Sequence, residues 1–163
     1  MASVFDPSRK KFVSLTPEEA VRQRVVQWLI ETLSVPLHLV ETEFALKNVE
    51  PRNSDRVDVL VHDFREGNSV KKPWLLVECK RPGVDSPAAL QAQVNKYLKV
   101  ISPKFIMLSL GRSSIFLALD IKSNSYRQVR TLPEYPPLTE NSGNPERKAR
   151  TADVHIQGLG NRD

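Results

Sequence analysis

The segments R-V-D-V-L-V at residues 56–61 and W-L-L-V-E-C-K-R at residues 74–81 are the most informative part of the chain. Each is a short apolar run bounded by polar residues, a pattern that predicts two neighbouring buried strands. Gly67, Asn68 and Ser69 mark the turn between them. The two strands are therefore expected at the centre of a sheet, where charged residues need an explanation.

Three charged residues, Asp58, Glu78 and Lys80, lie within these apolar runs. A buried charge costs several kcal/mol unless it is paired or bound to a metal. Glu78 and Lys80 are two residues apart, so they project from the same strand face, about 7 Å from each other. Cys79 points to the opposite, apolar face, and Asp58 on the neighbouring strand can face Glu78. The three charges are therefore predicted to meet.

Such a cluster has two interpretations. Two carboxylates with backbone carbonyl and water oxygens suit Mg²⁺ or Mn²⁺. Lys80 could then orient or deprotonate a water, or stabilise an oxyanion. The alternative is a structural ion pair, because an E-x-K tripeptide alone is usually a solvated pair of little consequence. The position of Glu78 and Lys80 beside Asp58 favours the first interpretation without excluding the second.

Length and composition limit the number of domains, the kind of partner and the kind of metal site that this chain can have. The 163 residues suffice for one domain, and a formal net charge of +5 favours a polyanionic partner. The single cysteine argues against an internal disulfide or a cysteine-rich zinc site, and the three scattered histidines argue against a histidine-based metal site. No apolar run approaches the roughly 20 residues of a membrane span, and no signal-peptide core is visible. A cytoplasmic protein without a membrane partner is expected.

A first helix is predicted after a basic N-terminal arm, residues 1–15. Thr16 suits the N-cap, Pro17 the first helical position, and Glu19 would complete a capping box. Helical periodicity places one broad apolar face toward the core. This face contains Val21, Val25, Val26, Trp28, Leu29, Ile30 and Leu33.

Glu18 and Arg22 lie near the middle of that apolar face, one turn apart, whereas Glu19 lies toward its edge. A glutamate and an arginine that point inward can supply a polar end to an active site. They can equally form an ion pair at the edge of the core. The helical pattern supports the two interpretations about equally.

A second helix is predicted from the cap Ser86, with Pro87 in its first position, to about Val100. Gln93 and Tyr97 are one turn apart and share a face, so both can reach the strand end that carries Glu78 and Lys80. Residues of these types on a helix more often occupy ordinary amphipathic positions. Helical spacing by itself therefore leaves their role open.

The remaining chain completes an α/β fold. Strands are predicted at residues 37–47, 104–110, 115–119 and 126–130. The order helix, three strands, helix, strands implies a mixed central sheet flanked by helices, with a parallel pair across the second helix. The folded domain is expected to comprise residues 16–132, followed by a disordered tail, residues 133–163.

This αβββαβ order, with Asp58 and Glu78-Cys79-Lys80 at its centre, resembles the PD-(D/E)xK nuclease superfamily and its restriction-endonuclease-like fold. More narrowly, the chain is similar to the N-terminal nuclease domain of type I restriction enzyme R subunits over roughly residues 8–132. The motifs that carry this similarity are R-K-K-F-V-S-L-T-P-E-E-A-V-R-Q, R-V-D-V-L-V, W-L-L-V-E-C-K-R-P, Q-V-N-K-Y and the strand that ends in Leu110-Gly111.

The resemblance implies a Mg²⁺-dependent endonuclease that hydrolyses DNA, with Mn²⁺ as an alternative ion. It implies that the metal is held by Asp58, Glu78 and the carbonyl of Cys79, and that Lys80 is the catalytic lysine. The resemblance also implies an acidic site residue on the first helix, which is Glu18 or, as the alternative, Glu19. It further implies that Gln93 and Tyr97 form a Q-x-x-x-Y motif of the site. Arg22 and Arg81 are candidate DNA contacts.

Two departures from the family pattern limit this expectation. Val57 replaces the proline that gives the superfamily its name, and the chain has no G-x-x-x-x-G-K-[ST] motif. No ATP site is therefore expected here, and separate restriction-system or repair subunits are possible partners, as is a second copy of the chain. A non-catalytic DNA-binding or assembly module of the same fold, and a repair or junction nuclease, are the alternative functions.

Overall fold

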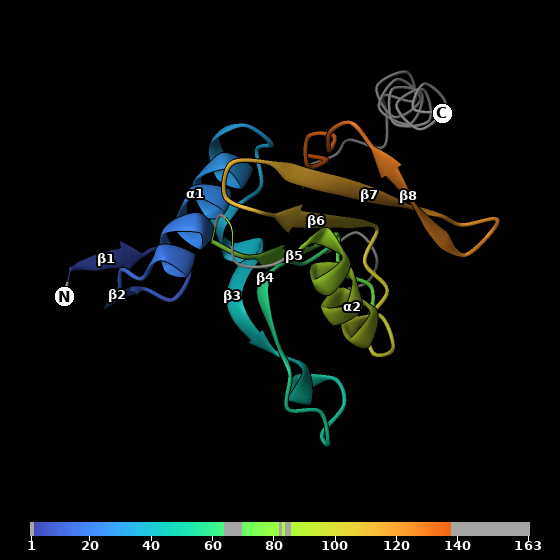
Figure 1. The fold of residues 1–163 in the computed structure, drawn as a ribbon, viewed down its shortest axis with the longest axis horizontal. Coiled ribbons are helices and arrows are strands. Elements are labelled where there is room, and N and C mark those ends of the chain that lie inside the picture. Colours follow the sequence, from blue (N-terminus) through green and yellow to red (C-terminus); the bar gives the residue numbers. More distant parts are fainter. Residues whose placement is uncertain (1, 64–69, 82, 84–85, 138–163) are drawn as a thin grey trace.

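The computed structural model describes residues 2–63, 70–81, 83 and 86–137, and its centre is a six-stranded sheet with two helices packed on it (Figure 1). A separate two-stranded hairpin lies at the N-terminus. In chain order the elements are β1 (Ser3–Asp6), β2 (Lys11–Ser14), α1 (Pro17–Glu31), η1 (Leu37–Leu39), β3 (Val40–Ala45), η2 (Leu46–Asn48), β4 (Arg56–Val61), β5 (Leu75–Cys79), α2 (Pro87–Tyr97), β6 (Phe105–Ser109), β7 (Ser114–Asp120) and β8 (Ser125–Val129).

The sheet is mixed, as predicted. Its strands follow the sequence, β3-β4-β5-β6-β7-β8. The pair β5 and β6, joined through α2, is parallel, and the other neighbouring pairs are antiparallel. The strand predicted over residues 37–47 is shorter, because a 3-10 turn occupies each of its ends. The predicted turn at Gly67, Asn68 and Ser69 lies outside the described residues.

Both helices begin where the sequence predicts. Thr16 Oγ1 accepts a hydrogen bond from the Glu19 N–H at 3.0 Å, and Ser86 Oγ accepts one from the Ala89 N–H at 3.2 Å. The capping box of α1 is only half formed. The Thr16 N–H donates to the carbonyl of Ser14, which leaves the Glu19 carboxylate available for other partners.

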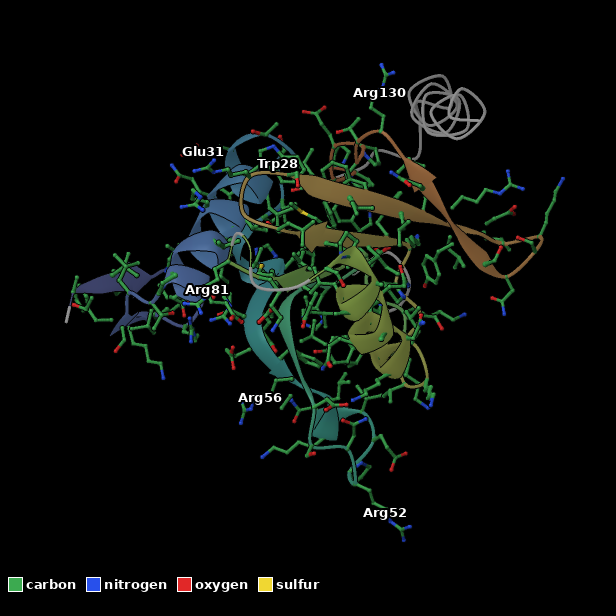
Figure 2. The ribbon with its side chains drawn as sticks, viewed as in Figure 1. Trp28, Glu31, Arg52, Arg56, Arg81 and Arg130 are labelled. Carbon is green, nitrogen blue, oxygen red and sulfur yellow. The ribbon has the colours of Figure 1, made fainter. Side chains whose placement is uncertain are left out.

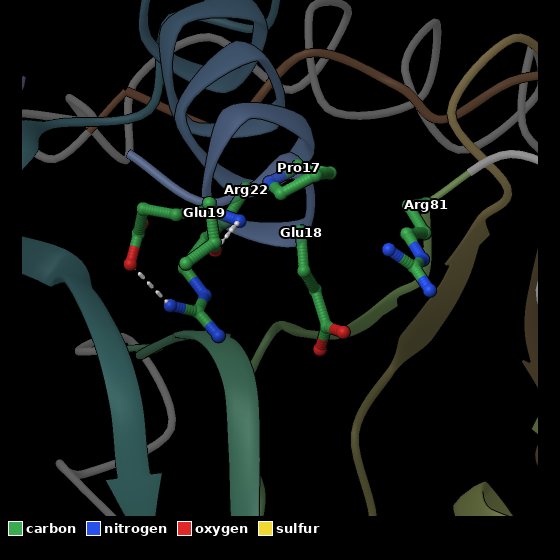
Figure 3. A pocket seen from close by; sticks show the side chains of 6 residues that line it. Pro17, Glu18, Glu19, Arg22 and Arg81 are labelled. Carbon is green, nitrogen blue, oxygen red and sulfur yellow. Dashed lines mark hydrogen bonds and ion pairs between the residues drawn. The ribbon is translucent and has the colours of Figure 1, made fainter. Parts of the chain in front are cut away.

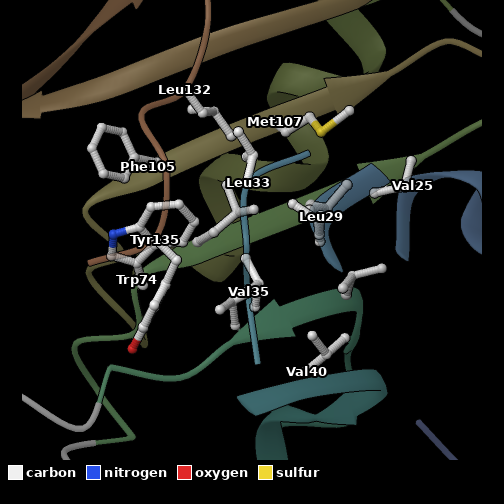
Figure 4. Close-up of a cluster of buried hydrophobic side chains, with 14 of the residues drawn as sticks. Val25, Leu29, Leu33, Val35, Val40, Trp74, Phe105, Met107, Leu132 and Tyr135 are labelled. Atoms are coloured by element: carbon white, nitrogen blue, oxygen red, sulfur yellow. The ribbon is translucent and has the colours of Figure 1, made fainter. Parts of the chain in front are cut away.

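Two apolar layers cover the two faces of the sheet. Side chains of α1 pack on one face, and Figure 4 shows this cluster around Leu29 and Met107. Side chains of α2 pack on the other face, around Leu90 and Ile106. Each fully buried side chain of this kind contributes roughly 1.5–3 kcal/mol through removal from water. The sheet between the two layers can therefore hold the residues at its edge in fixed positions.

The alternation along β5 separates the central residues as predicted. Val77 and Cys79 belong to the layer below α1, whereas Leu76 belongs to the layer below α2. Because successive side chains of a strand point to opposite faces, Glu78 lies on the α2 side and the Cys79 thiol is enclosed by apolar neighbours. Burial raises the pKa of that thiol, which makes Cys79 a core residue and not a nucleophile.

Both ends of the predicted domain need correction. Residues 1–15 are not a simple arm, because β1 and β2 pair in an antiparallel hairpin that holds Asp6 fully buried. At the other end the packed domain extends past residue 132. Tyr135 is buried against Trp74, with ring centroids 5.0 Å apart, and its hydroxyl donates to the His62 carbonyl. The tail predicted to be disordered falls outside the described residues from 138 onward.

No helix within the described part of the chain is both long and apolar enough to cross a membrane.

Candidate active site

The candidate site lies where strands β4 and β5 separate. Their last paired residues are Val59 and Val77, and Asp58 and Glu78 follow at that end. Asp58 Oδ2 accepts a hydrogen bond from the Cys79 N–H at 2.7 Å, which holds the aspartate against β5. Both carboxylates are buried, with exposed fractions of 8% and 4%. The structure thus brings together the two acidic residues that the sequence predicts to meet.

Of the two carboxyl groups, Glu78 has a strongly raised pKa. Burial is the largest cause, and the adjacent charge and hydrogen bond of Asp58 add to it, so that the pKa of Glu78 rises to about 9. The charge of Lys80 acts in the opposite direction but does not outweigh them. Without a further cation beside it, Glu78 is therefore held in its neutral form at neutral pH.

Lys80 lies at the open end of this pair. Its N–H donates to the Ser109 carbonyl at 2.8 Å, which fixes the backbone just beyond β5. Its Nζ is 4.0 Å from Glu18 Oε1, and about a quarter of its side chain is exposed, at 27%. Lys80 and Glu18 thus reach the same place from a strand end and from a helix start.

Arg22 is enclosed by three carboxylates. Its guanidinium donates to Asp58 Oδ1 at 2.9 Å, to Glu43 Oε1 at 2.6 Å and to Glu19 Oε1 at 2.7 Å. The ion-pair partner of Arg22 on α1 is therefore Glu19, which is buried and not at the edge of the helix face as expected. Its guanidinium is committed to these carboxylates, so Arg22 can hold Asp58 in place.

Two members of this network were not predicted from the sequence. Glu43 interrupts the β3–β4 pairing between Thr42 and Phe44, and its φ of 55° lies in the left-handed region that glycine favours. Arg9, from the hairpin, donates to Glu19 Oε1 at 2.8 Å. Nothing in the alternating pattern of β3 marks Glu43, and Arg9 resembles any residue of a basic run. Their roles appear only once the chain is folded.

The Gln93 and Tyr97 pair approaches Glu78 from α2. Gln93 Nε2 donates to the Tyr97 hydroxyl at 3.0 Å. That hydroxyl lies 3.0 Å from the Arg56 carbonyl and 3.3 Å from Glu78 Oε1. Burial, followed by the charge of Glu78, raises the pKa of Tyr97 above its usual value, so the phenol stays protonated. The pair can therefore orient Glu78 through a neutral hydrogen-bond donor.

A pocket of about 420 Å³ opens beside these residues (Figure 3). Its lining residues are Thr16, Pro17, Glu18, Glu19, Arg22 and Arg81. Glu18 enters it from α1, and Arg81 enters it from the segment after β5. Arg81 is exposed, in contrast to Arg22, and so remains the accessible guanidinium at this site. The pocket is large enough for a phosphate group and its surrounding water.

The chemistry of the donors suits a divalent ion. Asp58 and Glu78 offer adjacent carboxyl oxygens, and a bound Mg²⁺ would favour the ionised form of Glu78 that burial and Asp58 oppose. Within the residues that the structure describes, no three His, Cys, Asp or Glu side chains converge as a complete metal site. Mg²⁺ commonly binds through one or two carboxylates together with water and substrate phosphate, so an incomplete protein ligand set is compatible with this ion.

The raised pKa of Glu78 predicts how stability depends on pH. In EDTA the free energy of unfolding should fall as the pH rises from about 4.5 to about 9, because the unfolded chain ionises Glu78 freely in this range while the folded chain holds it neutral. Glu78→Gln keeps a neutral side chain, so at pH 8 it should be more stable than wild type by roughly 1–3 kcal/mol.

Thermal or urea unfolding at several pH values, in EDTA and in Mg²⁺, measures this effect. Mg²⁺ should stabilise wild type most at high pH and should have little effect on Glu78→Gln. Parallel pH profiles of the two proteins in EDTA would contradict the prediction.

Comparison with known protein families gives one match. The model of the family described as type I restriction enzyme R protein N terminus (HSDR_N) matches residues 17–133. The matched span includes both helices, the whole six-stranded sheet and the pair Asp58 and Glu78. The N-terminal hairpin lies before it. No curated protein and no solved structure matched the chain.

Proposed function

This chain belongs to the family of type I restriction enzyme R protein N termini, and on this premise we propose that it is a metal-dependent nuclease that hydrolyses phosphodiester bonds in DNA. The observation that supports this most is the meeting of Asp58, Glu78 and Lys80 where β4 and β5 separate, beside an open pocket. A structural ion pair would not need two adjacent buried carboxylates whose charges repel each other.

In this proposal Asp58 and Glu78 hold Mg²⁺, or Mn²⁺ in its place. The bound ion supplies positive charge that makes a water more acidic and offsets the charge of the scissile phosphate. Arg22 and the Cys79 N–H hold the Asp58 carboxylate in one orientation. The Cys79 carbonyl and Glu18 are the possible further ligands, because Glu18 is near Lys80 whereas the Glu19 carboxylate is already bound by two arginines.

The remaining residues act on the water and the substrate. Lys80 extends from the end of β5 to the mouth of the site, where its ammonium can hold the attacking water or stabilise charge on the phosphate. Tyr97, itself held by Gln93, keeps Glu78 in place. Arg81 offers its exposed guanidinium to a neighbouring phosphate across the pocket.

A cleavage assay tests this function directly. The purified chain is incubated with supercoiled, linear and single-stranded DNA in Mg²⁺, Mn²⁺ or EDTA, beside Asp58→Ala. We expect cleavage that requires the metal and is lost in the variant. Metal-independent DNA binding without cleavage under any of these conditions would favour the non-catalytic module instead, and selective cutting of branched substrates would favour a repair or junction nuclease.

A further inference from the structure

The N-terminal hairpin presents an exposed aromatic pair and two exposed lysines that the candidate active site does not use. Phe5 and Phe12 form a cross-strand pair, with ring centroids 5.4 Å apart and ring planes at 73°. Phe12 is 70% exposed and Phe5 is 48% exposed. Lys10 in the turn and Lys11 at the start of β2 are also exposed, and within the described residues neither forms an ion pair. Because successive side chains of a strand alternate, Lys11 points to the side opposite Phe12. Exposed aromatic residues next to unpaired cations indicate a binding surface.

The hairpin is held rigidly against the rest of the domain through the buried side chain of Asp6. Asp6 Oδ1 accepts hydrogen bonds from the N–H and the hydroxyl of Ser8, both at 2.8 Å, and Oδ2 accepts one from the Thr42 hydroxyl of β3 at 3.0 Å. Burial opposes ionisation, but hydrogen bonds from Ser8 and Arg9 outweigh it and lower the pKa of Asp6 to about 2. Asp6 is therefore ionised at neutral pH.

Arg9 provides a second anchor. It forms ion pairs with Asp6 and, on α1, with Glu19. The outward face of the hairpin thus has a defined orientation relative to α1 and β3. A surface that is already ordered loses little conformational entropy when it binds a ligand.

The hairpin also adjoins the pocket. Strand β2 continues through Leu15 into Thr16, which lines the pocket together with Arg81. Figure 1 shows the hairpin projecting beyond the start of α1, and Figure 2 shows Arg81 near its base. A nucleic acid strand that lies on the hairpin face can therefore continue past Arg81 toward Asp58 and Glu78.

We propose that the Phe5 and Phe12 side of the hairpin, with Lys10 and Lys11 at its turn end, binds single-stranded DNA next to the active site. Phe12 stacks on an unpaired base, the Phe5 ring supports it from the side, and the two lysines contact backbone phosphates. Surfaces for single strands combine aromatic stacking platforms with nearby positive charge in this way. In an intact duplex the base faces are stacked on one another, so Phe12 selects a single strand or a frayed end.

The proposal rests on the proposed function, because it names the form of DNA that reaches the cleavage site. The positive net charge of the whole chain, +5, agrees with a polyanionic ligand. The hairpin lies before residues 17–133, the span that matches the family model.

Binding of dye-labelled DNA, measured by fluorescence anisotropy in EDTA, tests the surface without cleavage. The probes are a 20-nucleotide single strand and the blunt duplex of the same sequence. We expect Phe12→Ala to weaken single-strand binding by roughly 5- to 100-fold, because base stacking on an aromatic ring has about this effect. Duplex binding should change less than about twofold, and Phe12→Trp should restore the affinity for the single strand.

Two further variants sharpen the test. Lys10→Ser combined with Lys11→Ser should weaken binding of both probes and reduce its salt dependence. Ile121→Ala is the matched control, because Ile121 is 85% exposed but lies in the turn between β7 and β8. This control should bind both probes like wild type. Unchanged single-strand binding by Phe12→Ala, or an equal loss on both probes, would overturn the proposal.

The outcomes separate this inference from the proposed function. Selective loss of single-strand binding in Phe12→Ala supports the binding surface even if wild type never cleaves DNA. Metal-dependent cleavage together with unchanged binding by Phe12→Ala supports the nuclease and rejects the hairpin surface.

Discussion

Replacing Lys80 with alanine is expected to abolish DNA cleavage while the protein remains folded. The Lys80 ammonium lies at the mouth of the site, near Glu18, and is positioned by the hydrogen bond of its own N–H to β6. A positively charged group held in place for a developing negative charge commonly contributes a factor of about 100–1,000 to the rate. Loss of cleavage by at least about 100-fold is therefore expected, measured with Mg²⁺ under single-turnover conditions.

Lys80→Ala should lower the free energy of unfolding only slightly. The Lys80 side chain is partly exposed, and exposed ion pairs contribute only about 0–1 kcal/mol. Lys47→Ala is a suitable control, because Lys47 is exposed and lies in the 3-10 turn after β3. The control should cleave like wild type. Cleavage by Lys80→Ala at the rate of this control would remove Lys80 from the mechanism.

Replacing Arg22 with methionine is expected to have the largest effect on stability. Burial by itself would lower the pKa of Arg22, but the hydrogen bond and charge of Asp58 outweigh burial and raise it. The guanidinium therefore stays charged. Its removal leaves Glu19, Glu43 and Asp58 close together without their shared cation. Removing one partner of a buried ionic network typically costs about 3–5 kcal/mol, and urea denaturation measures this loss.

Arg24→Met provides the matched control for this experiment. Arg24 is on the same helix but is exposed, so its loss should change the free energy of unfolding by less than about 0.5 kcal/mol. Arg22→Lys should be intermediate, because an ammonium keeps the charge but lacks the planar geometry that reaches several carboxylates. An Arg22→Met protein as stable as the control would show that the network does not stabilise the fold.

The sequence predicted the strands β4 and β5, both helix starts and the approach of Asp58 to Glu78, because these features depend on local patterns. Alternation between apolar and polar residues defines β4 and β5, and Thr16 and Ser86 cap the helices as their side chains predict. Asp58 and Glu78 stood out because a charge in an apolar strand is costly. Their meeting followed from strand pairing, which brings residues of neighbouring strands side by side.

The ion-pair partners and the domain ends depended on the tertiary structure. Helical spacing made Glu18 and Arg22 neighbours, but the arginine turns to Glu19, Glu43 and Asp58, which three different elements bring together. Arg9 and Asp6 lie in a short N-terminal segment, and their partners Glu19 and Thr42 are on α1 and β3, far along the chain. Ion pairs and buried hydrogen bonds are chosen by distance in space, and periodicity along one element cannot encode that choice.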